Sequence, residues 1–334
     1  MDKSFKFDFL ESNQSVYCDQ ERDNNVQKDT PQKNLLFGYS SAACKETSIR
    51  VHNLGPEVEN SNDQALSFYY DTLQVNELCS IQFVNEASLT NANIAPEVDA
   101  ASSDIIAGLY EGGLKVWECS IDLCKYLYEN YCKLDLIHAD TSLSVLELGC
   151  GHGLPGCLLL KELKYSSVLF SDFNDYVIYY ATMNNVRKNC IRIKDELQSS
   201  VDSSLSISQR TAFVSGDWIS LSRELMHNNQ RFFRDTSIAT DGKFDLVLAA
   251  ETTYTKAAAE STAHLFYTHV KFPHGVGIIA TKRYYFGCGG GTDAFRQALS
   301  KESGSQMRIE TLETFDNGKG NIRELLKISW QNCK

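Results

Sequence analysis

From about residue 102 to the end, short apolar runs alternate with longer runs whose apolar residues recur at helical spacing. The apolar runs predict strands at 145–149, 167–171, 211–215, 244–250 and 275–281. The runs between them predict helices near 118–132, 154–163, 174–189, 256–270 and 292–301. Asn174 is a plausible N-cap for the helix at 174–189. This alternation is typical of an α/β fold with a doubly wound, mostly parallel sheet.

The last two apolar runs differ from the others because no helix separates them. Runs 306–314 and 322–330 flank DNGKG at 316–320, a turn-forming sequence that predicts an antiparallel hairpin. Segment 190–210 ends in the serine-rich SSVDSSLSISQR and predicts a surface insertion. The sequence therefore predicts a parallel sheet closed by a terminal antiparallel hairpin.

The first hundred residues follow a different pattern. Residues 1–64 are mostly polar with few apolar clusters, which predicts a largely disordered tail. Residues 65–101 hold more apolar residues and predict an extension that docks on the main domain. The main domain is expected at 102–334.

Charge and cysteine content narrow the classes of partner. The net charge of −11 argues against direct binding to a nucleic-acid backbone and suits a basic protein substrate. The 11 cysteines are scattered, and neither they nor the seven histidines show metal-ligand spacing, which predicts reduced thiols and no metal site. Without a long apolar run or an export signal, the chain is expected in the cytoplasm and nucleus, including the nucleolus, with no membrane contact.

The most informative motif is VLELGCGHGLPG at 145–156, an apolar strand followed by a glycine-rich turn and a helix start. Gly151, Gly153 and Gly156 fit the GxGxxG pattern of dinucleotide sites, which is weak evidence alone. Counted from Gly149, the pattern is an acid, Glu147, followed by three glycines at alternate positions. That frame resembles motif I of class I methyltransferases, in which Glu147 would face the cationic cofactor or hold the turn.

Other polar and aromatic residues follow predicted strands and should gather at the carboxyl edge of the sheet, where ligands of such folds bind. Asp172 ends the second strand, where either cofactor class places an acid on the ribose hydroxyls. SGDW at 215–218 and ETTY at 251–254 also follow strands, and KRYYFGCGGG at 282–291 predicts a loop that closes over a substrate. LYEGGLKVWECSIDL at 109–123 places Trp117 before a helix, either over the cofactor or in the core.

Together and in this order, these motifs resemble those of the eukaryotic histidine protein methyltransferases, relatives of the lysine-directed protein methyltransferases. The resemblance covers about residue 102 to the end. It implies a class I fold with a seven-stranded sheet and the methyl donor S-adenosylmethionine, converted to S-adenosylhomocysteine. It also implies transfer of the methyl group to a histidine, at the tele nitrogen, of large ribosomal subunit protein three. A monomer is expected.

The resemblance assigns site residues by position. The residues expected to bind the cofactor are Val116, Trp117, Glu118, Cys119, Ser120, Glu147, Gly149, Gly151, Asp172, Phe173, Asn174, Gly216, Asp217, Trp218 and Ala250. Those expected at the substrate are Glu251 and Tyr254 as catalytic residues, with Tyr284, Tyr285, Phe286 and Gly289 around them. Glu147 stands where the family more often has Asp, and Asp217 where Glu is frequent; the segment before 102 scarcely matches.

The chemistry requires alignment more than a strong base, because a neutral imidazole offers a lone pair at physiological pH. Glu251 or a backbone carbonyl would accept the proton on the other ring nitrogen, while Tyr254 and Tyr285 would pack against the imidazole ring of the substrate. Three alternatives remain open: a lysine-directed enzyme of this fold, a non-catalytic relative that binds S-adenosylmethionine and assists ribosome assembly, and an NAD-dependent dehydrogenase. No Asn/Asp-Pro-Pro-aromatic sequence follows the 244–250 strand, which argues against base or glutamine methylation.

Overall fold

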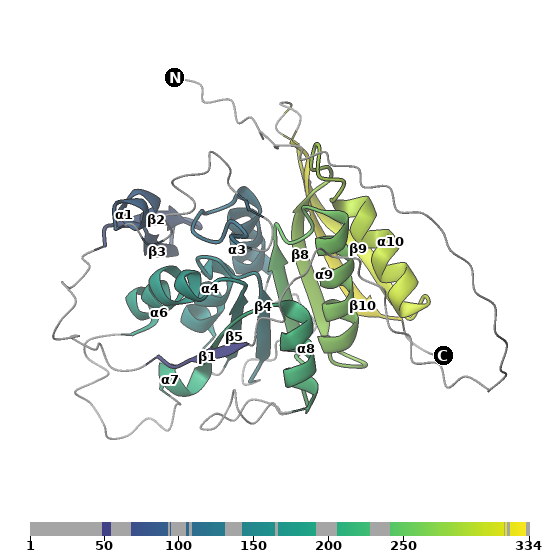
Figure 1. The fold of residues 1–334 in the computed structure, drawn as a ribbon, viewed down its shortest axis with the longest axis horizontal. Coiled ribbons are helices and arrows are strands. Elements are labelled where there is room, and N and C mark those ends of the chain that lie inside the picture. The colour runs from purple at the N-terminus through teal and green to yellow at the C-terminus, as the bar shows by residue number, and fades with distance from the viewer. Residues whose placement is uncertain are drawn as a thin grey trace, which may run out of the picture.

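A computed structural model describes residues 49–54, 68–92, 94, 105–106, 109–130, 142–163, 166–191, 206–227, 241–316, 318 and 321–331. Its centre is an eight-stranded sheet in the order β1-β6-β5-β4-β7-β8-β10-β9 (Figure 1). The parallel strands are β4 (Ser144–Leu148), β5 (Ser167–Asp172), β6 (Thr211–Ser215), β7 (Leu246–Ala250) and β8 (Val276–Lys282). The antiparallel strands are β1 (Arg50–His52), β9 (Met307–Phe315) and β10 (Arg323–Trp330).

Helices cover both faces of this sheet (Figure 1). One layer holds α3 (Glu118–Asn130), α4 (Leu154–Glu162) and α6 (Met183–Cys190). The other holds α8 (Trp218–His227), α9 (Lys256–His269) and α10 (Thr292–Ser303). Because successive strand residues point to opposite faces, Val145 packs in the core beneath the first layer and Leu146 in the core beneath the second. Burial of both faces explains why these strands read as continuous apolar runs.

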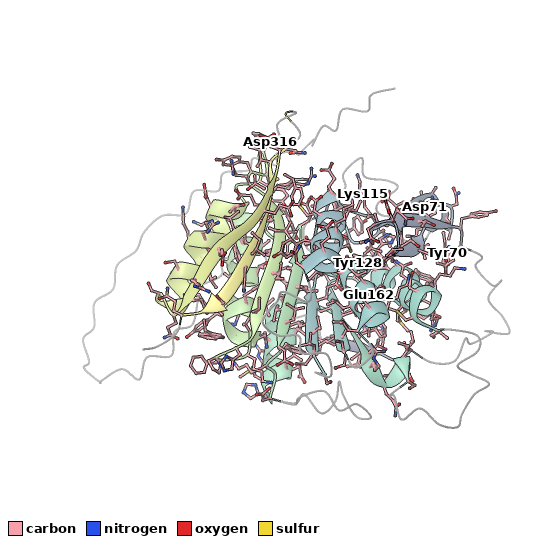
Figure 2. All side chains as sticks on the ribbon, turned by 180° about the vertical axis from the view of Figure 1, so that it is seen from behind. Tyr70, Asp71, Lys115, Tyr128, Glu162 and Asp316 are labelled. Atoms are coloured by element: carbon pink, nitrogen blue, oxygen red, sulfur yellow. The ribbon has the colours of Figure 1, made fainter. Side chains whose placement is uncertain are left out.

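The extension before the main domain forms a small unit of its own. Strands β2 (Tyr70–Gln74) and β3 (Ser80–Val84) pair antiparallel and lead into α1 (Glu86–Asn91). In Figure 2, Tyr70 and Asp71 mark this unit, and Asp316 marks the tip of the β9–β10 hairpin. The unit is tied to α6 because Asn185 Oδ1 accepts the Val84 N–H at 2.7 Å.

Two predictions about the strands need correction. The sheet has eight strands, not seven, because β1 adds an edge strand antiparallel to β6. β1 lies within the segment 1–64 that its polar composition predicted to be a tail, so residues 49–54 are ordered on the domain. The three residues of β1 are held by backbone pairing with β6, so they can be ordered without the apolar composition on which the prediction relied. The rest of that segment lies outside the described residues.

The predicted helices occur, with three differences. The helix expected at 174–189 is α5 (Asp175–Val177) and α6, joined by the π-helical turn η2 (Ile178–Thr182). Segment 190–210, predicted as an insertion, contains the short helix α7 (Ile207–Arg210); residues 192–205 lie outside the described residues. Helix α8 was not predicted. Across the described ranges, every helix is too short or too polar to cross a membrane.

Candidate functional site

The glycine-rich turn after β4 has the backbone conformation that its sequence predicts. Gly149, Gly151 and Gly153 have φ values of +56°, +51° and +65°, which residues with a Cβ rarely adopt. A Cβ at Gly151 would lie only 3.1 Å from the Gly113 carbonyl oxygen. Gly153 is the N-cap of α4. The turn therefore places the start of α4 against the 111–117 segment.

Glu147 stabilises this turn through a hydrogen bond to the start of α4. Its Oε2 accepts the Gly156 N–H at 2.8 Å, within the first turn of α4. The residue is 4% exposed, and burial raises the pKa of its carboxyl to about 8, although the Gly156 hydrogen bond opposes the shift. Of the two roles expected for Glu147, the geometry supports holding the turn.

This burial makes stability depend on pH at Glu147. The ordinary pKa of the group is 4.5, so between that value and about 8 the unfolded chain loses its proton while the folded chain keeps it. Folding stability contributed by this group is therefore lost as the pH rises through this window. Glutamine keeps an acceptor for Gly156 and has no proton to lose. We expect the urea midpoint of Glu147→Gln, relative to the wild type, to rise between about pH 5 and about pH 8.5. A flat or falling difference would contradict the assignment.

Asp172 and Asn174 join the end of β5 to the glycine turn and to the 109–111 segment. Asp172 Oδ2 accepts the Gly151 N–H at 2.9 Å, and its Oδ1 accepts the Asn174 N–H at 3.2 Å. Burial raises the pKa of Asp172 to about 6 against these hydrogen bonds. Asn174 is at the N-cap position of α5 as predicted, but its side chain does not cap the helix. It instead donates to the Leu109 carbonyl and accepts the Glu111 N–H.

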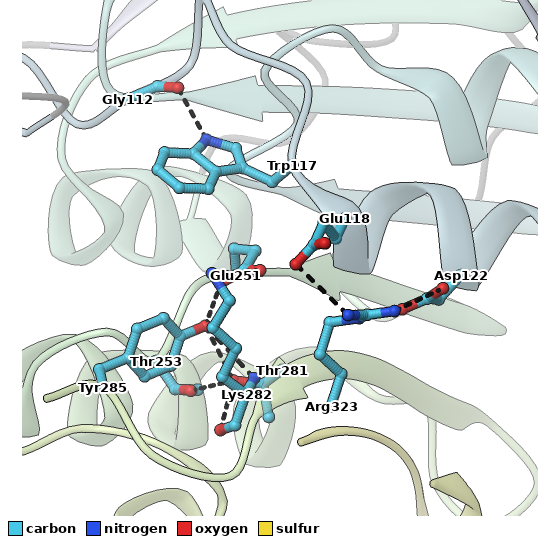
Figure 3. A network of polar contacts seen from close by, with 10 residues as sticks. All are labelled: Gly112, Trp117, Glu118, Asp122, Glu251, Thr253, Thr281, Lys282, Tyr285 and Arg323. Carbon is cyan, nitrogen blue, oxygen red and sulfur yellow. Dashed lines mark hydrogen bonds and ion pairs between the residues drawn. The ribbon is translucent and has the colours of Figure 1, made fainter. Parts of the chain in front are cut away.

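The segment around Trp117 is held over this edge by hydrogen bonds from several elements. Trp117 Nε1 donates to the Gly112 carbonyl at 3.0 Å (Figure 3). Glu86 of the extension accepts the Val116 N–H at 2.7 Å. His152 Nε2, in the glycine turn, lies at hydrogen-bond distance, 2.9 Å, from the Leu114 carbonyl oxygen. The extension thus helps to position a segment that was expected to bind the cofactor.

Glu251 is the most constrained residue at this edge. It directly follows β7 with φ of +58°, and it is one of two non-glycine residues in the described chain with positive φ. Its side chain is 6% exposed. Oε2 accepts the Tyr285 O–H, and Oε1 lies 3.3 Å from Lys282 Nζ (Figure 3). The buried Cys119 thiol donates to the same carboxylate. Burial and the Glu251 charge raise the pKa of Tyr285 well above its usual range, so Tyr285 remains a donor.

Lys282, at the end of β8, was not among the predicted site residues. Its Nζ pairs with Glu251 and lies 5.3 Å from the Trp117 ring centroid and 5.6 Å from that of Tyr285. The residue is 5% exposed. A lysine that ends an apolar strand was the available signal, but the sequence could not show that its partner is Glu251.

Tyr254 also has a partner that the sequence did not indicate. Its O–H donates to the Glu111 carboxylate, which joins the loop after β7 to the 109–117 segment. Burial and the Glu111 charge raise the pKa of Tyr254 well above its usual range. The predicted catalytic pair is thus separated into two networks, Glu251 with Tyr285 and Tyr254 with Glu111.

The residues after β6 form another side of the site. Trp218 Cζ2 would lie 3.5 Å from a Cβ at Gly149, so this half-buried ring borders the glycine turn. Gly216 has φ of +132°. Asp217, expected near an adenine amine, uses Oδ1 to accept the Ile219 and Ser220 N–H groups at the start of α8.

The remaining predicted residues differ in exposure. Glu118 has a side chain 54% exposed and pairs with Arg323, which also binds Asp122 (Figure 3). Tyr284 and Phe286 are 54% and 72% exposed, whereas Tyr285 between them is buried. Phe173 and Ser120 are half-buried, Ala250 ends β7, and Gly289 bridges to Thr255 with φ of +72°.

Two observations indicate that a ligand can bind at this edge. The left-handed glycines leave their backbone without covering side chains, which permits close approach by a ligand. Thr252, whose Cγ2 would lie 3.0 Å from a Cβ at Gly149, has a buried Oγ1 without a hydrogen-bond partner in the described structure. Such an unpaired buried hydroxyl is costly unless a ligand or water satisfies it.

Comparison with known families identifies a matching sequence model. Residues 107–204 match the family described as lysine methyltransferase. This segment includes the Trp117 segment, the glycine turn and Asp172.

Curated relatives match a longer part of the chain. A histidine protein methyltransferase 1 homolog of Dictyostelium discoideum is 35% identical over 227 residues, which are 68% of this chain and 60% of the relative. The Bos taurus homolog is 32% identical, over 68% of this chain and 58% of the relative. Histidine protein methyltransferase 1 of Saccharomyces cerevisiae is 26% identical, over 83% and 84%. The chain thus spans less than two thirds of the first two relatives.

Solved structures show a more distant likeness. Magnesium protoporphyrin IX methyltransferase from Synechocystis, with bound S-adenosylhomocysteine, has a TM-score of 0.42 and 11% identity. The match covers 74% of this chain and all of that chain.

Proposed function

The chain belongs to the methyltransferase family whose curated members include the histidine protein methyltransferases, and we propose that it methylates a histidine side chain of a protein. S-adenosylmethionine is the cofactor of this family. When bound, it supplies a methyl carbon to which an imidazole lone pair bonds while the carbon–sulfur bond breaks, giving S-adenosylhomocysteine and a methylated imidazolium that loses its ring N–H proton to solvent.

The residues of this chain would hold the two reactants in line. The glycine turn and Asp172 would receive the amino-acid and ribose portions, and Trp218 would border the base. Trp117, the Glu251 network and the 283–291 loop would then face the acceptor. Alignment of this kind supplies much of the rate in reactions between two bound reactants.

The observation that carries the proposal is the conformation of Glu251. A non-glycine residue with φ of +58° costs on the order of 1–3 kcal/mol, and such strain persists where surrounding contacts impose it, often at functional sites. Its Oε1 forms an ion pair with Lys282 Nζ at 3.3 Å but has no hydrogen bond in the part of the chain that the structure describes, and a carboxylate oxygen has lone pairs for more than one donor. Oε1 can therefore accept the N–H of an imidazole and fix its tautomer, with Tyr285 and Lys282 holding the carboxylate. Because this side chain is buried, the 283–291 loop must open to admit the ring.

For the substrate, we favour large ribosomal subunit protein three, methylated at the tele nitrogen of a histidine. The motif resemblance supports this choice, and the net charge of −11 suits a basic ribosomal protein. Such a substrate would place the enzyme in the cytoplasm and the nucleus.

The test is label transfer. The purified protein would be incubated with a ribosomal-protein extract and methyl-labelled S-adenosylmethionine, followed by mass spectrometry of the labelled proteins. We expect label on one histidine of one large-subunit protein. Label on other proteins of the extract would contradict the proposed substrate. Cofactor binding without any methyl transfer would favour a non-catalytic binding protein.

A lysine-directed activity is the second candidate, because the matching family model is described as lysine methyltransferase. The same digest distinguishes the two activities, since methyllysine and methylhistidine separate after acid hydrolysis. Methyllysine as the main product would replace the histidine proposal.

A further inference from the structure

Lys282 and Glu251 form a buried ion pair on the side of the site that the proposed function assigns to the acceptor. Their side chains are 7% and 6% exposed, and Nζ lies 3.3 Å from Oε1. The other titratable groups on this carboxylate are the Tyr285 hydroxyl, from the loop after β8, and the Cys119 thiol, from α3. Both remain neutral donors because their pKa values are well above the usual range. The described groups on Glu251 therefore carry one positive charge against its one negative charge.

This balance matters because two acceptor types differ in charge at neutral pH. A lysine side chain arrives as an ammonium and must lose a proton before it can attack, whereas an imidazole with a pKa near 6.5 is largely neutral. An unpaired carboxylate would attract the ammonium. At this site Lys282 already occupies the carboxylate, and its own charge repels a second cation.

We propose that Lys282 is a positioning residue that selects a neutral imidazole over a lysine ammonium by neutralising Glu251. The inference rests on the proposed histidine methylation and extends it to the origin of acceptor selectivity. Stability alone gives weak reason for such a pair, since buried ion pairs can often be replaced by apolar residues without loss of stability. The Trp117 and Tyr285 rings further fix the ammonium, which lies within 6 Å of both centroids.

The test compares Lys282→Met, Lys282→Arg and the control Lys271→Met. Met keeps the approximate length without the charge, and Arg keeps the charge. Lys271 is a lysine that pairs with the Asp245 carboxylate and has no contact with Glu251 among the described interactions. Each variant would be incubated with the ribosomal-protein extract and tritiated S-adenosylmethionine, and methylhistidine and methyllysine would be quantified after hydrolysis. Cofactor affinity and melting temperature would be measured in parallel.

We expect Lys282→Met to lower the ratio of methylhistidine to methyllysine at least about tenfold, since a substrate ammonium can replace the missing counterion. Lys282→Arg should restore most of the wild-type ratio, and Lys271→Met should leave it unchanged. An unchanged ratio in folded Lys282→Met would overturn the proposal. Methyllysine as the wild-type product would instead refute the proposed function, so the two failures are distinguishable.

A measurement on the wild type keeps the proposal testable if Lys282→Met does not fold. 4-Methylimidazole and n-butylamine, which resemble the two side chains, would be titrated as inhibitors of label transfer. We expect 4-methylimidazole to inhibit at a concentration at least about tenfold lower, because the amine is cationic at assay pH. Equal inhibition, or stronger inhibition by the amine, would overturn the proposal.

Discussion

Glu251→Gln is expected to lower kcat for methyl transfer to the protein substrate about 100-fold, near the upper end of the roughly 1.5–3 kcal/mol that a hydrogen bond to a charged group contributes. Glutamine keeps the size of the side chain, but it removes the counterion of Lys282 and presents an amide donor where the imidazole N–H needs an acceptor. Affinity for S-adenosylmethionine should change less than about threefold, since the glycine turn and Asp172 are untouched. Single-turnover transfer and calorimetric titration of the cofactor measure the two quantities separately.

Glu324→Gln provides the matched control for this change. Glu324 has a side chain 8% exposed and pairs with Arg283, so the substitution also breaks a partly buried ion pair near the end of β8. We expect both variants to lose stability but only Glu251→Gln to lose the transfer step. Equal loss of kcat in the two variants would assign Glu251 a structural role only.

Most of the sheet was predictable because buried parallel strands leave a strong apolar pattern. The strands expected at 145–149, 167–171 and 211–215 match β4, β5 and β6 to within one residue at each end. β1 was not predicted, because a short edge strand relies on the pairing partner and not on its own composition. The π-helical turn η2 was not predicted for a related reason. Thr182 Oγ1 donates to the Gly151 carbonyl at 2.6 Å, and no local sequence pattern encodes such a tertiary contact.

At the site, the sequence indicated which residues reach the carboxyl edge but not which of them touch. Glycine at 149 and 151 allows a left-handed backbone, and both residues adopt it. Glu251 and Tyr254 lie three positions apart and read as one motif, yet their partners come from the loop after β8 and from the 109–117 segment. Lys282 was missed because a lone lysine at a strand end is uninformative without its partner.

Gly151→Ala is expected to weaken S-adenosylmethionine binding at least about tenfold, which is about 1.4 kcal/mol. Alanine at φ of +51° costs roughly 1–2 kcal/mol of backbone strain. Its Cβ would also lie 3.1 Å from the Gly113 carbonyl oxygen, so the turn and the 111–117 segment must separate. Because the Gly151 N–H donates to Asp172, that shift moves the acid proposed to receive the ribose. Calorimetric titration of the cofactor, with urea unfolding alongside, tests both consequences.

Gly304→Ala is a control that introduces the backbone strain of alanine at positive φ without a steric contact of its Cβ. Gly304 is the C-cap of α10 with φ of +53°, and a Cβ there would meet nothing within 4 Å. The Gly304→Ala variant should therefore have its free energy of unfolding lowered by backbone strain about as much as Gly151→Ala. Its affinity for the cofactor should be unchanged. Since the two glycines share one backbone conformation, any excess effect at Gly151 measures the close approach of the turn to the 111–117 segment. Equal cofactor affinity in the two variants would mean that the turn does not line the cofactor site.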